Sequence, residues 1–321
     1  MRILVVGAGA IGGYVGGRLL EKGRDVTFLV RERRKAELAA HGLEIDSPMG
    51  NLRLPNPPTV LSSELRPEYD VILLSCKAYD LESAIASFAP AVGPRTAVIP
   101  LLNGLRHIDV LQEHFGKHSV LGGFCKISCT LQPGGRIAHF GKLHMMIYGE
   151  LDGQRTERAA AFEEAFSGAN LETRLSTEIL QEMWEKWVFI AVCAGITCLM
   201  RASLGDVVRA GGESVSLALL DECARVAASQ GHAPSEESMK WNRSMLTEPR
   251  SAMFASMERD IERGASIEGE HLIGDLLRRG QQAGVEAPLL RLVHLHLQSY
   301  LERRKREAAA EKHEPATAGL P

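Results

Sequence analysis

The sequence lacks several patterns that would point to a particular function. Its 321 residues carry a formal net charge of -3, so no broad basic surface indicates nucleic acid and no charge block indicates a membrane surface. The six cysteines include no Cys-x-x-Cys pair, and several lie in apolar runs, which predicts reduced, buried thiols rather than zinc ligands or disulfides. No nucleophile elbow is present and the histidines scatter, so a Ser–His–Asp enzyme is not indicated.

Long hydrophobic runs are also scarce. The longest uncharged apolar run, residues 187–200, is shorter than the ~20 residues that span a bilayer. A strand expected from residue 3 leaves no room for a signal peptide, so we expect a cytoplasmic protein. The hydrophobic content of 45% and the charged content of 24% are ordinary for a globular protein, and the length is enough for two domains.

The clearest motif lies at the N-terminus. Residues 3–6 form a short apolar run, and Gly7, Gly9 and Gly12 follow with the spacing G-x-G-x-x-G. Apolar residues then recur at helical spacing. Strand, glycine turn and helix together bind the pyrophosphate of a dinucleotide: the first glycine permits a tight turn, the second lets the backbone approach the ligand, and the third lets the helix pack on the strand. The alternative is an ordinary strand–helix turn that favours glycine.

A cluster of basic residues follows the second expected strand, residues 25–30. In a dinucleotide-binding fold this strand end meets the adenosine ribose, and an acidic residue there would bind the 2′-hydroxyl group of NAD. This chain instead has Arg31, followed by Arg33, Arg34 and Lys35. A guanidinium group binds a 2′-phosphate in a fork, so the sequence favours NADP over NAD. The alternative is a solvated basic helix start.

Two more apolar runs, residues 69–75 and 96–102, predict central parallel strands that are covered on both faces. Lys77 lies just past the first run and Asn103 just past the second. Ligands of open α/β sheets bind beyond the carboxyl ends of the strands. We therefore expect Lys77 and Asn103 to share one edge with Arg31 and the glycine turn.

From about Thr177 to about Arg306 helical periodicity dominates. We expect an NADP-binding Rossmann domain over residues 1–176, a helical substrate and catalytic domain over 177–306, and a disordered tail over 307–321. The first domain should include strands at 119–130, 136–140 and 144–149, the first two flanking a Pro-Gly-Gly turn. The helices expected in the second domain are 179–194, 212–230, 236–244, 251–263, 271–282 and 289–305.

Lys186 is the sharpest catalytic candidate from the residues alone. It lies in the apolar helix expected over 179–194, between Trp184 and Trp187. An isolated ammonium group is rarely buried, and burial would lower its pKa toward the working pH, which suits a proton donor. The alternatives are a side chain that snorkels to solvent, or one that pairs with Glu182 one turn earlier.

The order and spacing of six elements resembles the ketopantoate reductase (2-dehydropantoate 2-reductase) family, over residues 1 to about 305. The resemblance implies an α/β Rossmann-type N-terminal domain and an all-α C-terminal domain similar to that of 6-phosphogluconate dehydrogenase. It implies NADPH-dependent reduction of a 2-oxo acid to a 2-hydroxy acid: ketopantoate to pantoate in pantothenate biosynthesis, or a related substrate. The elements are residues 7–12, Arg31, Ser75-Cys-Lys77, Leu102-Asn-Gly104, Trp184-Glu-Lys186, and Ser256 followed twelve residues later by Glu268.

The resemblance also implies roles for individual residues. Lys186 would protonate the substrate carbonyl oxygen, and Glu268 would hydrogen-bond a substrate hydroxyl group. Ser256 would contact the substrate carboxylate, and Asn103 would lie between nicotinamide and substrate. Without the resemblance, Glu268 is simply a carboxylate in the first turn of a helix. The implied cofactor-binding residues are Gly7, Ala8, Gly9, Ala10, Ile11, Gly12 and Asn103, with Arg31 and Lys77 on the 2′-phosphate.

The chain departs from the family pattern near the expected substrate. The family has asparagine where this chain has Ile190, Ala194 and Leu204. Each lost hydrogen bond to a bound polar substrate costs about 0.5–1.5 kcal/mol, so these changes favour a 2-oxo acid other than ketopantoate. Arg201 is a charge that the family pattern lacks, and one hypothesis is that it binds a substrate carboxylate. The alternative is a solvated arginine at a helix end.

Two other functions stay open from the sequence. The protein could oxidise another hydroxy acid with the same architecture, or it could be an NADP-binding sensor that has lost turnover. The apolar residues Ile190 and Ala194 motivate the sensor, whereas retention of Lys186 and Glu268 favours an enzyme. We expect a small-molecule substrate, no metal, and no nucleic-acid or membrane partner. A homodimer is compatible with the apolar helices of the second domain.

Overall fold

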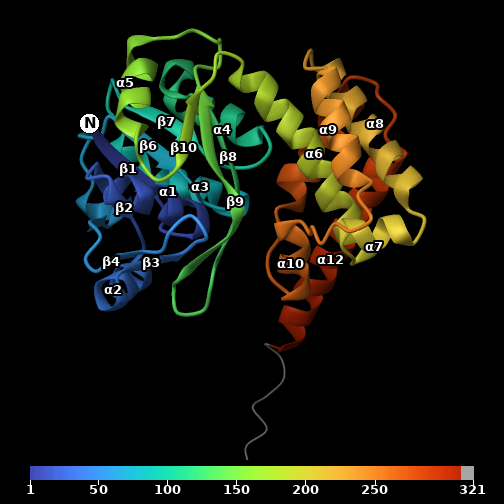
Figure 1. Cartoon of the computed structure of the whole chain (residues 1–321), viewed down its shortest axis with the longest axis horizontal. Coiled ribbons are helices and arrows are strands. Elements are labelled where there is room, and N and C mark those ends of the chain that lie inside the picture. Colours follow the sequence, from blue (N-terminus) through green and yellow to red (C-terminus); the bar gives the residue numbers. More distant parts are fainter. Residues whose placement is uncertain (312–321) are drawn as a thin grey trace, which may run out of the picture. The chain divides into compact units, whose positions relative to one another are not determined.

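The computed structural model describes residues 1–311. The chain forms two compact units, Met1–Met183 and Trp184–Pro321, which we describe in turn (Figure 1). Their boundary lies within helix α6 (Ile179–Met200), not just before it at residue 176 as expected. Of the disordered tail expected over residues 307–321, residues 307–311 instead belong to α12 (Pro288–Glu311), and the rest lies outside the described residues.

The centre of the first unit is a five-stranded parallel sheet with the strand order β5-β2-β1-β6-β7 (Figure 1). Every residue of β6 and β7 is buried, as expected for strands covered on both faces. Val6 pairs in register with Leu29 and with Leu74, so these strands end level with one another. The strands are β1 Arg2–Val6, β2 Asp25–Leu29, β5 Thr59–Val60, β6 Val71–Leu74 and β7 Ala97–Pro100.

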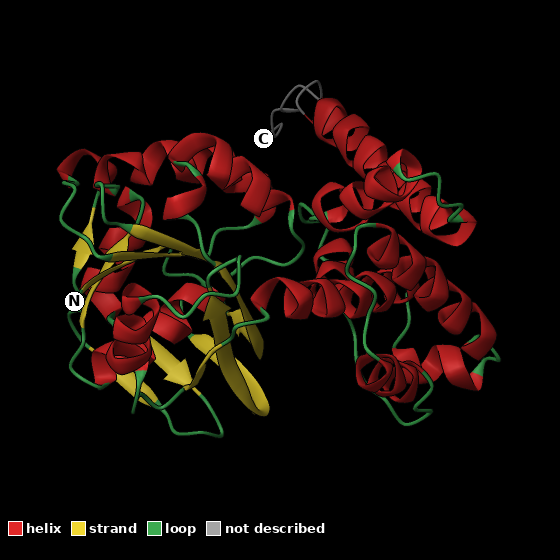
Figure 2. Cartoon of the chain, turned by 90° about the horizontal axis from the view of Figure 1, so that it is seen from above, coloured by secondary structure: helices red, strands yellow, loops and turns green. Residues whose placement is uncertain are grey.

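Helices connect these strands and pack against the sheet (Figure 2). The predicted Rossmann-type architecture is confirmed. The sequence analysis did not predict α4, although its His107, Ile108 and Leu111 are buried on one face. The helices of this unit are α1 Ala10–Glu21, α2 Glu32–His41, α3 Leu81–Phe88, α4 Arg106–Phe115 and α5 Glu157–Phe166.

A second, mixed sheet completes the first unit, with the order β10-β9-β3-β4 and with β8 paired to β9. The strands expected at 136–140 and 144–149 are one strand, β9, because pairing with β8 continues on both sides of an irregularity at Ile127/Ser128. The exposed residues between them hid this continuity in the sequence. The strands are β3 Leu43–Asp46, β4 Leu52–Leu54, β8 Gly122–Leu131, β9 Ile137–Gly149 and β10 Glu172–Leu175.

In the second unit, the described residues form helices and no strand (Figure 2). The all-α prediction is therefore confirmed. The unpredicted α7 is capped by Ser203, whose hydroxyl accepts a hydrogen bond from the Asp206 N–H, and a π-helix, Glu270–Gly274, precedes α11. The α-helices after α6 are α7 Leu204–Arg209, α8 Glu213–Ser229, α9 Glu236–Leu246, α10 Ser256–Glu262, α11 Asp275–Gln282 and α12.

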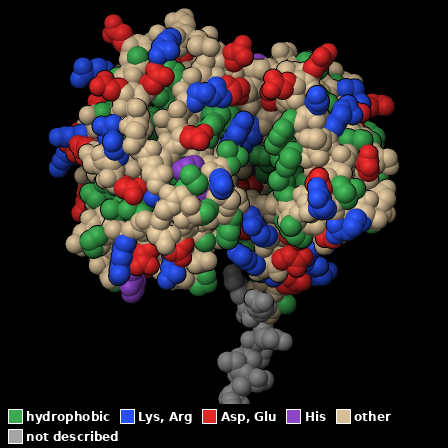
Figure 3. Space-filling model, viewed as in Figure 1, with side chains coloured by type: hydrophobic (Ala, Val, Ile, Leu, Met, Phe, Trp, Pro, Cys, Tyr) green, Lys and Arg blue, Asp and Glu red, His purple; other side chains and the backbone are tan. Residues whose placement is uncertain are grey.

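Helix α6 has 22 residues, so it continues past the expected end at residue 194. By length and composition it is apolar enough to cross a membrane, contrary to the expectation that no segment is long enough. However, 67% of its most apolar window is buried in the fold, which is typical of a core helix. On the molecular face shown in Figure 3, acidic and basic side chains are interspersed, in keeping with the small net charge.

Candidate active site

The glycine turn between β1 and α1 has the geometry that a dinucleotide requires. Gly7 has a φ of 93°, and its N–H donates to the Leu29 carbonyl at 3.0 Å. A Cβ atom at Gly12 would lie 2.2 Å from the Gly7 carbonyl oxygen, so only glycine fits. A Cβ atom at Gly9 would meet no heavy atom within 4 Å, and this open side of the turn is where a ligand could approach the backbone.

Side chains from two other elements hold this turn in place. The Ser75 hydroxyl, just after β6, donates to the Val6 carbonyl at 2.9 Å and lies 3.2 Å from the Gly7 carbonyl. The Arg34 guanidinium donates to the Ala8 carbonyl at 3.2 Å. In the sequence, Arg34 is only one of several basic residues, and no pattern indicates a role for Ser75 by itself. Nothing in their spacing identifies these contacts.

The N-terminus of α1 is available to an anion. Gly9 is its N-cap residue and supplies no side-chain cap, and the first turn has no acidic residue. Ala10 and Ile11 in this turn are half-buried. The helix N–H groups and the positive end of the helix dipole therefore lie beside the open side of Gly9, without a side-chain cap.

Arg31 lies two residues after β2 and is 79% exposed. Its Nη2 atom lies 3.5 Å from the Asp80 carboxylate and 3.5 Å from the Ser83 hydroxyl. Within the described residues, its Nε and Nη1 donors have no protein partner, so part of the guanidinium fork faces solvent. Asp80 thus orients the guanidinium while leaving donors for an anion.

Lys77 and Asn103 lie just beyond the ends of β6 and β7, and both are half-buried. Because Leu74 pairs in register with Val6 and with Pro100, these ends are level with the end of β1. The structure therefore brings Lys77, Asn103, Arg31 and the glycine turn to one edge of the sheet, as expected.

In the second unit, Lys186 lies on α6 between two contacts that fix this helix. On one side, the Glu185 carboxylate accepts a hydrogen bond at 2.8 Å from the Ser235 N–H, just before α9. On the other side, the Trp187 indole N–H donates to the Leu272 carbonyl at 2.9 Å. Lys186 therefore lies in the chain between two residues that tie α6 to other segments of this unit.

The alternative pairing of Lys186 with Glu182 competes with other bonds of that carboxylate. Glu182 accepts hydrogen bonds from the Arg174 guanidinium and, at 2.5 Å, from the Ser176 hydroxyl. Although burial raises the pKa of Glu182, these hydrogen bonds hold it below its usual value. Lys186 itself is half-buried rather than fully buried.

Glu268 and Ser256 reach the neighbourhood of α6 from separate segments. The Glu268 carbonyl accepts the Leu272 N–H at 2.9 Å, so Glu268 stands at the start of the helix that Trp187 contacts. Ser256 is the exposed first residue of α10, and the preceding Ala255 N–H lies 3.4 Å from the Thr197 hydroxyl of α6. The segments of Glu268 and Ser256 therefore both contact α6, the first at Trp187 and the second at Thr197, eleven residues after Lys186.

Arg201 lies at the end of α6 and pairs with α10, the helix that begins at Ser256, so along α6 it is far from Lys186. Arg201 follows Lys186 by fifteen residues, about 22 Å along a helix with a rise of 1.5 Å per residue. Its Nε atom donates to the Glu262 carboxylate at 2.8 Å. Its φ of 54° is the left-handed conformation that ends α6.

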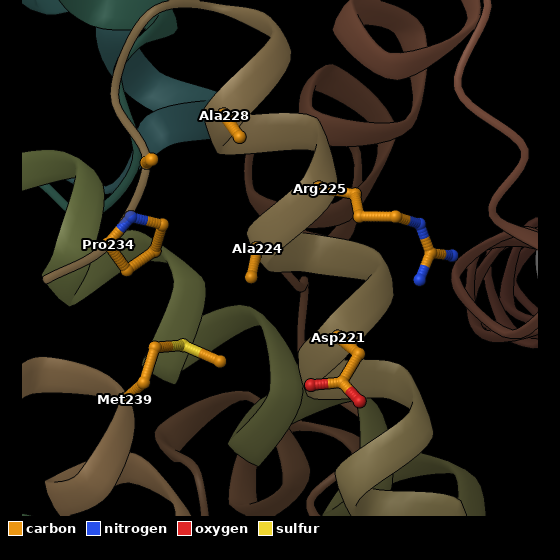
Figure 4. Close-up of a pocket in the computed structure, with 7 residues that line it drawn as sticks. Asp221, Ala224, Arg225, Ala228, Pro234 and Met239 are labelled. Atoms are coloured by element: carbon orange, nitrogen blue, oxygen red, sulfur yellow. The ribbon is translucent and has the colours of Figure 1, made fainter. Parts of the chain in front are cut away.

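An open pocket of about 460 Å³ lies elsewhere in the second unit, beside α8 and α9 (Figure 4). Figure 4 shows Asp221 and Arg225 at one side and Pro234 and Met239 at the other. None of the residues predicted for the active site lines this pocket.

Comparison with known proteins decides the family. The model of ketopantoate reductase PanE/ApbA matches residues 3–153, and the model of its C-terminal domain matches residues 178–300. The uncharacterized oxidoreductase YkpB of Bacillus subtilis is 40% identical, with 94% of this chain and 99% of that protein covered. The chain belongs to the ketopantoate reductase family. The expectation of an oxidoreductase is thereby confirmed.

Other proteins similar to this chain carry the names of two different activities. A 2-dehydropantoate 2-reductase of Archaeoglobus fulgidus is 29% identical over 90% of this chain and 94% of its own length. A solved structure of D-mandelate dehydrogenase with NADH and anilino(oxo)acetate is 22% identical, with a TM-score of 0.84 over 95% of this chain and 99% of that one. This second likeness supports the fold alone.

The positions where this chain departs from the family pattern are apolar in the structure as well. Ile190, one turn after Lys186, is half-buried, and Ala194 is 1% exposed. Leu204 is fully buried at the start of α7, where its N–H donates to the Met253 carbonyl at 3.0 Å. Phe189, next to Ile190, packs edge-on against the exposed Trp241 at 4.8 Å between ring centroids. The surface of α6 beyond Lys186 is therefore apolar and partly aromatic.

Proposed function

We propose that this protein is a cytoplasmic NADPH-dependent reductase that converts a 2-oxo acid to a 2-hydroxy acid. The observation that supports the proposal is the arrangement around α6, where the neighbours of Lys186 bond to the segment before α9 and to the helix that follows Glu268, and where the residue before Ser256 lies close to Thr197. An amine, a carboxylate and a hydroxyl group on separate segments are the groups that protonate, orient and bind a small oxo acid.

The nicotinamide cofactor supplies the hydride to the carbonyl carbon when it is bound. Lys186 donates a proton to the carbonyl oxygen as negative charge develops there. Glu268 accepts a hydrogen bond from the 2-hydroxyl group as it forms and holds it near the lysine, and the Ser256 hydroxyl donates to the substrate carboxylate. Lys186 then regains its proton from solvent.

The residues of the first unit fit a dinucleotide. The open side of Gly9 and the uncapped N-terminus of α1 would receive the pyrophosphate. Asn103 would approach the nicotinamide end. The exposed donors of Arg31, with Lys77, would bind the 2′-phosphate, which supports NADPH over NADH.

We further propose that the substrate carries an apolar side chain. Ketopantoate has a polar hydroxyl-bearing side chain, whereas the surface of α6 beyond Lys186 offers Ile190 and Ala194. A polar substrate group placed against such a surface loses hydrogen bonds that water supplied, at a cost of about 1–3 kcal/mol when it stays unpaired. An apolar substituent at the same place would instead gain binding free energy, because the contact removes apolar surface from water.

NADPH oxidation measured against a panel of 2-oxo acids tests this proposal. We expect turnover with 2-oxo acids that have aliphatic or aromatic side chains, at a higher kcat/KM than with ketopantoate. Tight NADPH binding without turnover of any oxo acid would favour the sensor. Faster reduction of NADP with 2-hydroxy acids at neutral pH would favour the oxidative dehydrogenase. The homodimer stays a prediction, and sedimentation equilibrium would test it.

A further inference from the structure

Trp187 connects the backbone beside Lys186 to the helix that begins at Glu268. Its indole N–H donates to the Leu272 carbonyl at 2.9 Å, and the side chain is 1% exposed. The Leu272 N–H donates in turn to the Glu268 carbonyl at 2.9 Å. Because Trp187 directly follows Lys186, these two hydrogen bonds link the backbone next to the expected proton donor to the backbone of the expected substrate-orienting carboxylate.

The segment that accepts the indole hydrogen bond has an unusual geometry. Residues Glu270–Gly274 form a π-helix, in which the Asp275 N–H donates to the Glu270 carbonyl five residues earlier. A Cβ atom at Gly274 would lie 2.5 Å from the Glu270 carboxylate, so glycine makes room for this side chain inside the wide turn. Single π-helical turns are rare and frequently accompany functional sites. The groups that donate to the Glu270 carboxylate come from Arg278 and Gln298, and His294 lies 2.9 Å from it.

The face of the indole is also held in place. The Arg279 guanidinium lies 5.8 Å from the Trp187 ring centroid and 5.9 Å from that of Trp184. Its Nε atom donates at 2.9 Å to Asp275, which is 3% exposed. The two indole rings contact each other at 4.9 Å between centroids. Trp187 is thus fixed by a carbonyl at its edge and by a buried ion pair at its face.

We infer that Trp187 is a positioning residue, which sets the distance between the Lys186 amine and the Glu268 carboxylate through the Leu272 carbonyl. The inference rests on the proposed function, in which both groups act on one small substrate. Proton transfer requires donor and acceptor within about 2.6–3.2 Å, and a misplacement of about 1 Å can reduce the rate about 100-fold. A rigid link between the two segments therefore affects turnover more than substrate binding.

The variant Trp187→Phe tests this link, because it keeps an aromatic ring and removes the N–H donor. Trp184→Phe is the matched control: Trp184 is 3% exposed and belongs to the same ring cluster, but within the described residues it makes ring contacts only. We expect Trp187→Phe to lower kcat about tenfold, with a smaller change in KM, and Trp184→Phe to stay within about twofold of the wild type. The Kd for NADPH should not change in either variant.

Hydrogen exchange gives a readout that does not depend on turnover. The Leu272 amide and its neighbours should exchange faster in Trp187→Phe than in the wild type, and at the wild-type rate in Trp184→Phe. A wild-type kcat in Trp187→Phe, or equal losses of kcat in both variants in proportion to Tm, would overturn the inference. Failure of the proposed function is distinct: it would show as wild-type turnover in Lys186→Ala, with the exchange result unaffected.

Discussion

The two candidate sites, the cofactor edge of the first unit and the surroundings of α6 in the second, are built by different means. The cofactor edge consists mostly of backbone: the glycine turn, the N-terminus of α1 and the level ends of parallel strands. In the surroundings of α6, side chains join segments about eighty residues apart, as where the Trp187 indole donates to the Leu272 carbonyl. A backbone site tolerates few changes, whereas single substitutions can change which substrate a side-chain site accepts, and we propose this for Ile190 and Ala194.

Lys186→Ala should have the largest effect on turnover of the variants proposed here, because it removes the proposed acid. It leaves the cofactor edge of the first unit intact. We expect kcat to fall about 10²–10⁴-fold, with an unchanged Kd for NADPH. Steady-state kinetics with the best 2-oxo acid, together with NADPH titration, would measure both quantities. Lys240→Ala, which changes an exposed lysine of α9, is the control and should retain wild-type kcat. Loss of NADPH binding in Lys186→Ala would contradict the separation of the two parts.

Two glycine variants should separate folding from cofactor binding. In Gly12→Ala the new Cβ would lie 2.1 Å from the Ser75 hydroxyl and 2.2 Å from the Gly7 carbonyl, so we expect a loss of stability of about 1–3 kcal/mol. In Gly9→Ala the Cβ meets no atom within 4 Å, so stability should be retained while NADPH affinity falls. Chemical denaturation and fluorescence titration would measure the two effects. Wild-type NADPH affinity in Gly9→Ala would refute the assignment of this turn to the pyrophosphate.

Arg31→Ala should lower the affinity for NADPH about tenfold and leave that for NADH unchanged, because only NADPH carries the 2′-phosphate. The ratio of the two dissociation constants is the measurement. Arg33→Ala is a suitable control, since Arg33 is 92% exposed and its Nε atom lies 3.3 Å from Glu37. If the wild-type protein bound NADH more tightly than NADPH, the proposal that Arg31 binds the 2′-phosphate would be wrong.

A buried histidine cluster should make the first unit sensitive to acid. The His144 Nδ1 atom lies 2.8 Å from the Tyr14 hydroxyl, and burial lowers the pKa of His144, as do the nearby His139 and Arg18. The unfolded chain therefore binds this proton more readily than the folded one. The stabilising contribution is present above the ordinary histidine pKa of about 6.5 and is lost as the pH falls below it.

Hydrogen exchange of α1 and β9 between pH 7.5 and 5 would measure this loss. The stability of these elements should fall less steeply with decreasing pH in His144→Asn, because asparagine does not titrate in this range. An identical slope in the variant would assign the acid sensitivity to other groups.

Arg201→Ala should have the smallest effect. Its partner Glu262 and its distance along the chain from Lys186 lead us to expect a KM within about twofold of the wild type, and a stability loss of no more than about 1 kcal/mol, as for an exposed ion pair. Kinetics with the best substrate would check this expectation. A large rise in KM would instead support the sequence hypothesis that Arg201 binds a substrate carboxylate.

Much of the fold could be predicted from the sequence, because its signals are local. Apolar runs of four to seven residues marked the parallel strands, and helical spacing marked the second unit. The end of α6 at Arg201 could not be predicted in this way. It depends on a left-handed residue that carries no glycine or asparagine signal. The continuity of β9 depends on pairing with β8, which the exposed middle of the strand conceals.

The sequence by itself determined the glycine turn, the basic residue after β2, and a lysine within an apolar helix, because each follows from a few adjacent residues. Only the tertiary structure decided that Ser75 and Arg34 hold the glycine turn, that Glu262 takes up Arg201, and that Trp187 links Lys186 to Glu268. These contacts join residues far apart in the chain. Their partners are mostly backbone carbonyls. Because every residue carries one, no pattern of side chains in the sequence predicts these contacts.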